Sequence, residues 1–155
     1  MNFFKIISII LLGMTLTACK NPFNSLDADL CWSDATKAST LEIVKKSVDQ
    51  HLVSSLKKDR ILSGYDWTES DTERAKKLLN YKLNNFFVRS VSSDGNSVNC
   101  GTNVSITLKA SNEKQFNTTS IIGFELYKAE NEQYITTISG QELGRLKLDL
   151  ESELE

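Results

Sequence analysis

The spacing of apolar residues changes once along this chain, and that change limits the folds open to it. From residue 98 to 108, core-type side chains occupy every second position: Val98, Cys100, Thr102, Val104, Ile106 and Leu108. Such alternation is typical of a strand with one face on the core, and Asp94-Gly95 just before it is a strong hairpin-turn signal. Upstream of residue 87, apolar residues instead recur every three or four positions, as in helices. The chain is therefore predicted to be an α+β domain, with helices before strands.

Two helices are expected before the strands. The first can be capped by Ser33 or Asp34, is stopped by Ser63-Gly64, and has a stripe of Leu41, Val44, Val48, Leu52 and Leu56. The second is predicted to open with a capping box between Ser70 and Glu73. Its expected stripe consists of Ala75, Leu78, Leu79, Leu83 and Phe86.

Four strands are expected over residues 87–92, 98–108, 122–126 and 133–139, with a polar loop over 110–120 and a turn at Glu130-Asn131-Glu132. The leucines after Gly140 fit either helical or strand spacing, and a helix is favoured. The predicted fold is two N-terminal helices packed on a four-stranded antiparallel meander, with a C-terminal helix and one disulfide.

The first eighteen residues have the pattern of an export signal. Lys5 precedes an apolar run from Ile6 to Met14, about half the roughly 20 residues that a spanning helix needs. The run ends in Leu16-Thr17-Ala18-Cys19, which resembles the lipobox of bacterial lipoproteins. The alternatives are an ordinary cleaved signal peptide or a short buried helix. The domain prediction is a signal peptide over 1–18, a tether over 19–30 and a single α+β domain over 31–155.

The lipoprotein resemblance implies a membrane anchor without a spanning helix. In that family the chain is cut before the cysteine, here Cys19, which then carries fatty acyl chains such as palmitate. Each buried methylene contributes about 0.8 kcal/mol, so several chains together hold a protein on a bilayer. Lys20 after the cysteine implies sorting to the outer membrane of a Gram-negative cell, facing the periplasm. The rest of the chain also resembles small lipid-anchored bacterial envelope proteins in its layout.

With Cys19 assigned to the anchor, Cys31 and Cys100 remain. Two cysteines in an exported protein are most simply a disulfide. Two free buried thiols or half of a metal site are the alternatives, but no CxxC or HxxxH spacing occurs.

Catalytic and cofactor motifs are absent from the sequence. His51 is the one histidine and has no nucleophile motif beside it, so a solvated or partly packed helix residue is the simpler interpretation. Seven glycines form no P-loop or GxGxxG, and 18 Lys plus Arg against 20 Asp plus Glu argue against nucleic-acid binding. We expect neither an enzyme nor a cofactor.

Two groups near the helix–helix loop are candidates for binding. The acidic set is Asp66, Glu69, Asp71 and Glu73. It does not match an EF-hand, so no metal site is predicted from it. Tyr65 and Trp67 have the composition of a partner-binding loop, because both residue types are enriched in interface hot spots. They can instead cover the open end of the core.

Three functions follow from these patterns. The favoured one is a membrane-anchored envelope lipoprotein that acts as a non-enzymatic binding or accessory module. The alternative is a periplasmic inhibitor or immunity protein against a hydrolase or toxin. The third, an enzyme using carboxylates such as Asp66 and Glu69, has the least support. The expected partners are the bilayer, through acylated Cys19, and an envelope protein.

Overall fold

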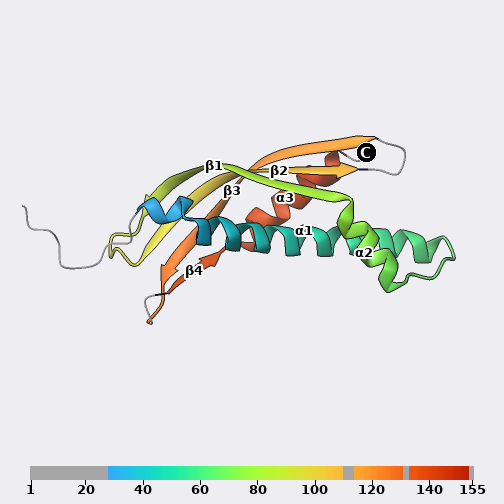
Figure 1. Cartoon of the computed structure of the whole chain (residues 1–155), viewed down its shortest axis with the longest axis horizontal. Coiled ribbons are helices and arrows are strands. Elements are labelled where there is room, and N and C mark those ends of the chain that lie inside the picture. The colour runs from blue at the N-terminus through green and yellow to red at the C-terminus, as the bar shows by residue number, and fades with distance from the viewer. Residues whose placement is uncertain (1–27, 110–113, 131–132, 154–155) are drawn as a thin grey trace, which may run out of the picture.

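Helices and strands follow one another in the predicted order in the computed structural model, which describes residues 28–109, 114–130 and 133–153 (Figure 1). The chain starts with a short 3-10 helix, η1 (Ala28–Trp32), and continues with α1 (Asp34–Leu62) and α2 (Glu69–Lys77). The strands are β1 (Leu79–Val91), β2 (Ser97–Lys109), β3 (Gln115–Lys128) and β4 (Tyr134–Thr137), and α3 (Gly140–Ser152) follows them. The predicted signal peptide, Cys19 and most of the predicted tether lie outside the described residues, while residues 28–30 of that tether belong to η1.

The sheet is an antiparallel meander with strand order β1-β2-β3-β4, as predicted. Gly95 at φ 70° supplies the positive backbone angle that the Asp94-Gly95 turn needs between β1 and β2. The long helix α1 runs along one face of the sheet, and α3 lies near the same face (Figure 1). The predicted α+β class, with a C-terminal helix, is confirmed.

Two apolar clusters form the core between the helices and the sheet. The larger one joins α1, the first three strands and α3 through Val44, Val48, Leu52, Leu79, Val104, Ile106, Leu108, Ile122, Leu146 and Leu150. The smaller one surrounds the two cysteines with Val98, Phe124 and Leu126. The predicted stripe of the first helix therefore faces the sheet, and Ser33 caps that helix by accepting a hydrogen bond from the Thr36 N–H (3.2 Å).

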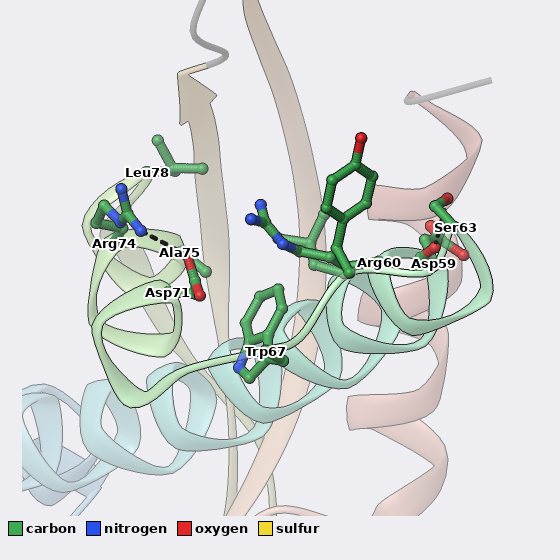
Figure 2. Close-up of a pocket in the computed structure, with 10 residues that line it drawn as sticks. Asp59, Arg60, Ser63, Trp67, Asp71, Arg74, Ala75 and Leu78 are labelled. Carbon is green, nitrogen blue, oxygen red and sulfur yellow. Dashed lines mark hydrogen bonds and ion pairs between the residues drawn. The ribbon is translucent and has the colours of Figure 1, made fainter.

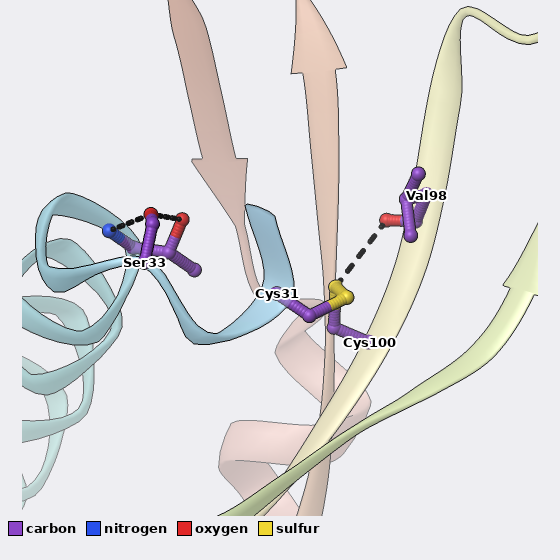
Figure 3. Close-up of a disulfide and its surroundings, with 5 residues drawn as sticks. Cys31, Ser33, Val98 and Cys100 are labelled. Atoms are coloured by element: carbon purple, nitrogen blue, oxygen red, sulfur yellow. Dashed lines mark hydrogen bonds between the residues drawn. A yellow bond between two sulfur atoms is a disulfide. The ribbon is translucent and has the colours of Figure 1, made fainter. Parts of the chain in front are cut away.

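The predicted disulfide is present and ties η1 to β2 (Figure 3). Cys31 and Cys100 are fully buried, and their Cα atoms are 5.7 Å apart. This link between residues that are 69 positions apart fixes η1 against one of the two central strands of the sheet.

The second helix is shorter than predicted, because Leu79, Leu83 and Phe86 belong to β1 and not to α2. Residues 79, 81 and 83 are Leu, Tyr and Leu, so the same leucines also alternate with polar residues. Pairing of Leu79 with Leu108 and of Leu83 with Val104 gives this segment ladder hydrogen bonds and buries its apolar face. Pairing with β2 thus determines the conformation of this segment, although its leucines also have a helical spacing.

Strand boundaries also differ from the predictions. β1 begins at Leu79 and not at residue 87, and β4 is limited to Tyr134–Thr137. β3 begins at Gln115, inside the predicted loop, because small polar Thr118 and Ser120 are buried on the core face and continue the alternation of that strand. Residues 110–113, and Asn131 and Glu132 of the predicted turn, lie outside the described residues.

The short β4 leaves part of the β3 backbone free to contact α3. β4 pairs with residues 125–128 of β3. Farther along that edge, the Arg145 guanidinium donates to the Ile121 carbonyl (3.2 Å), and the Gly123 N–H donates to the Glu142 carboxylate. α3 thereby satisfies backbone groups that an open sheet edge leaves exposed.

Candidate functional site

A cavity of about 670 Å³ opens between the end of α1, the following loop and α2, at the far end of α1 from η1 (Figures 1 and 2). We call it the hairpin groove. Its lining consists of Leu56, Asp59, Arg60, Ser63, Tyr65, Trp67, Asp71, Arg74, Ala75 and Leu78. The two aromatic residues singled out in the sequence, Tyr65 and Trp67, therefore line one hollow.

The chain reverses direction at Gly64, and this reversal places both aromatics over the groove. Gly64 has φ 79°, and the Tyr65 N–H donates to the Arg60 carbonyl (3.1 Å), which closes the last turn of α1. The Arg60 guanidinium then lies 5.5 Å from the centre of the Tyr65 ring, a cation–π contact. Tyr65 itself is 64% exposed.

Trp67 is held in place by its indole nitrogen. Nε1 donates to the Thr72 hydroxyl in α2 (2.8 Å), so the polar atom of the ring is satisfied within the domain. What the ring presents to the groove is apolar surface, alongside Leu56, Ala75 and Leu78. Ala75 is buried, and Leu56 and Leu78 pack against the main core, so this wall is continuous with the core.

The capping box at the start of α2 is formed by Thr68 and Asp71, not by the predicted Ser70 and Glu73. Thr68 has the extended backbone that an N-cap needs, and its N–H donates to the Asp71 carboxylate (2.9 Å). In return the Asp71 N–H donates to the Thr68 hydroxyl (3.3 Å). The helix begins two residues earlier than expected because Thr68 and Asp71 have the same spacing as the predicted pair.

Asp71 is an anion with several partners. Hydrogen bonds from the Thr68 side chain and amide, with the positive charge of Arg74, lower its pKa from 3.8 to about 2. Arg74 Nη2 donates to Asp71 Oδ1 at 2.5 Å. This carboxylate therefore stays ionised at neutral pH and is used by the fold.

The remaining members of the acidic set do not converge on one point. Glu73 pairs with Lys76 (2.8 Å), which lowers the pKa of Glu73, and Asp66 and Glu69 are exposed. Within residues 28–109, 114–130 and 133–153, no three His, Cys, Asp or Glu side chains are grouped so as to hold a metal ion.

His51 is half-buried and joins two helices. Its Nε2 lies 2.8 Å from the Glu151 carboxylate of α3, so the one histidine takes part in helix packing. This agrees with the interpretation of His51 as a partly packed helix residue.

A second, polar hollow of about 290 Å³ lies where Arg89, Asn99, Glu125 and Glu142 meet. Arg89 contacts the Glu142 carboxylate (3.0 Å), and Arg145 contacts the other oxygen of the same group. Burial raises the pKa of Glu142, but the hydrogen bonds from Arg89 and from the Gly123 amide outweigh it and leave that pKa lowered. These charges satisfy one another and fasten α3 to the sheet.

Sequence reasoning found Tyr65 and Trp67 but did not connect them with Arg60 and Arg74. Arg60 lies near the end of the first predicted helix and Arg74 lies in the second, so no local pattern links them. The positive φ at Gly64 and the early start of α2 bring the four together.

Comparisons with known proteins identify no family for this chain. The chain matches no family model and no curated protein. Among solved structures it is similar to the intermembrane-space region of the chloroplast protein ARC6, with 18% identity and a TM-score of 0.25 over 66% of this chain and 97% of that one. At that TM-score the similarity carries no inference about function. In the part of the chain that is described, none of the helices is both long and apolar enough to cross a bilayer.

Proposed function

We propose that this chain is an envelope lipoprotein whose folded domain is a non-enzymatic binding module. Cys19 carries the acyl anchor, on the outer membrane facing the periplasm, and the hairpin groove binds a protein partner. The inhibitor alternative uses the same groove with a hydrolase or toxin as its partner, so the identity of the partner distinguishes the two.

The observation that carries this proposal is the position of the groove relative to the anchored end. The described residues start with η1, at one end of α1, and the groove lies at the other end (Figure 1). Twenty-nine helical residues at about 1.5 Å each separate the two ends by about 43 Å. The segment from Cys19 to Ala28 reaches at most about 30 Å when fully extended. A lipid on Cys19 would thus keep the η1 end near the bilayer and leave the groove accessible.

Lipidation is tested with Cys19→Ala in cells labelled with radioactive palmitate. We expect the wild type to incorporate palmitate and to fractionate with membranes. The variant should incorporate none and accumulate as a larger, unprocessed precursor. Normal processing of Cys19→Ala would disprove the anchor without affecting the groove.

Partner binding is tested by placing a photo-crosslinking amino acid at position 65 in living cells. We expect one discrete adduct with an envelope protein, and we expect Trp67→Ala to abolish it, because the groove then loses the large ring of its apolar wall. Tyr134 is a matched control, since it is an exposed tyrosine (46%) on β4, away from the groove. Equal adducts at positions 65 and 134, or an adduct that Trp67→Ala leaves intact, would rule out the groove as the binding site.

A further inference from the structure

We infer that the hairpin groove recognises a polypeptide segment in which an Asp or Glu side chain lies next to a large apolar side chain. This inference rests on the proposed binding function and names the chemistry of the partner.

The positive charge available in the groove is Arg60. Among the described residues, its guanidinium has a cation–π contact with Tyr65, and its charge helps to lower the pKa of Asp71, but it forms no hydrogen bond or ion pair. Figure 2 shows the Arg60 side chain extended from α1 into the hollow, toward Arg74 of α2. A guanidinium has five N–H donors in a planar fork that matches a carboxylate, and stacking on Tyr65 holds that fork in a defined plane.

The two carboxylates of the lining do not occupy these donors. Asp71 accepts hydrogen bonds from Thr68 and Arg74, as described above. Asp59 also lines the groove, beside Ser63 (Figure 2), and among the described residues it forms no ion pair with Arg60. The lining has two arginines and two aspartates, so its charges cancel in number. They do not cancel in position, because Asp71 is paired with Arg74 while Arg60 has no ion pair and can bind an incoming carboxylate.

An apolar subsite lies next to this charge. Trp67 presents its ring while its N–H is bound to Thr72, and Leu56, Ala75 and Leu78 complete the wall. A large aliphatic or aromatic side chain can be buried there, and its neighbouring carboxylate then reaches Arg60. Charge-assisted hydrogen bonds strengthen as water is excluded, so the two contacts support one another.

The surface beyond the groove favours a polypeptide over a small molecule or a bilayer. Ile61 and Leu62 are 54% and 76% exposed and adjoin the groove at the end of α1, which extends the apolar surface past what a small ligand covers. Attraction to anionic lipid needs an excess of basic residues near the surface. Residues 57–78 contain six Lys or Arg and five Asp or Glu, a nearly neutral mixture that suits a partner with charges at matching positions.

The test uses phage-displayed random 12-residue peptides selected on the lipidated mature protein in nanodiscs. We expect the enriched peptides to place Asp or Glu within three positions of Trp, Phe or Leu. Changing that acidic residue to its amide should weaken binding about tenfold or more, as loss of a charged hydrogen bond does. Arg60→Glu should weaken it at least as much, and a Lys in place of the peptide carboxylate should restore binding to that variant.

Lys58→Glu is the matched control, because it makes the same charge change on an exposed neighbour outside the groove lining. We expect it to alter peptide affinity less than threefold. Arg60→Gln is tested in parallel, since it removes the charge without placing a carboxylate near Asp71. Circular dichroism checks that each variant is folded.

Several outcomes would overturn the inference. They are enrichment of peptides without acidic residues, no enrichment at all, or equal effects of Arg60→Glu and Lys58→Glu. Binding of phosphatidylglycerol vesicles in place of peptides would assign the surface to a bilayer. If the photo-adduct at position 65 depends on Trp67 but not on Arg60, the proposed binding function is supported and the inference of an acidic partner is wrong. If that adduct is absent, the proposed function itself fails.

Discussion

Replacing both disulfide cysteines, with Cys31→Ala and Cys100→Ala, is expected to lower the free energy of unfolding by about 4 kcal/mol. The bond closes a loop between residues 69 positions apart, and in the chain-entropy model a loop of this length restricts the unfolded chain by that amount. Both cysteines are fully buried in the cluster with Val98, Phe124 and Leu126, so their loss also loosens η1 from β2. Urea denaturation of the mature protein, followed by circular dichroism, measures the change.

The wild type in a reducing agent is the natural control for this experiment. It should unfold at the same urea concentration as the double variant, whereas the reducing agent should leave the double variant unaffected. A loss below about 1 kcal/mol would contradict the loop argument. Thiols that react with an alkylating reagent in the unfolded, unreduced wild type would contradict the bond itself.

The α+β class, the meander and the disulfide were predictable because each depends on a pattern that is local or simply counted. The alternation from Val98 to Leu108 survives in the structure because β2 lies between two other strands, with one face on the core. The cysteine pairing follows from the number of cysteines left once Cys19 is set aside. Neither inference requires knowing which segments meet in space.

The start of β1 could not be predicted in the same way, because its leucines satisfy two periods at once. Leu79 and Leu83 are four residues apart, which suits a helix as well as every second position of a strand. The choice is made by β2, whose Leu108 and Val104 lie opposite them. A partner strand some twenty-five residues away along the chain thus decides the conformation, and no local window contains it.

In the groove, too, some residues could be identified from the local sequence and others only from the folded structure. Tyr65 and Trp67 were identifiable as aromatics in a turn-rich loop. The availability of the Arg60 guanidinium was not, because it depends on Asp71 being hydrogen-bonded to Thr68 and Arg74 rather than to Arg60. The capping box therefore determines both where α2 begins and which charge is left for a ligand.

Leu146→Ala, in the C-terminal helix, is expected to have the second large effect on the free energy of unfolding. Leu146 is fully buried in the main core cluster, and the adjacent turn contributes Leu150. Removing a buried leucine side chain typically costs about 2–5 kcal/mol, from lost transfer energy and from the cavity left behind. We expect a loss in this range, measured by urea denaturation of the mature protein with the disulfide intact.

Leu148→Ala is the matched control, since it makes the same substitution in the same helix at a side chain that is 65% exposed. Its effect should stay within about 0.5 kcal/mol. The comparison also distinguishes the two spacings of the tail, because a strand with one buried face would bury Leu146, Leu148 and Leu150 together. Equal losses for the two variants would support the strand. A large loss for Leu146→Ala alone requires the helical arrangement, in which Leu146 and Leu150 share a face and Leu148 points away from it.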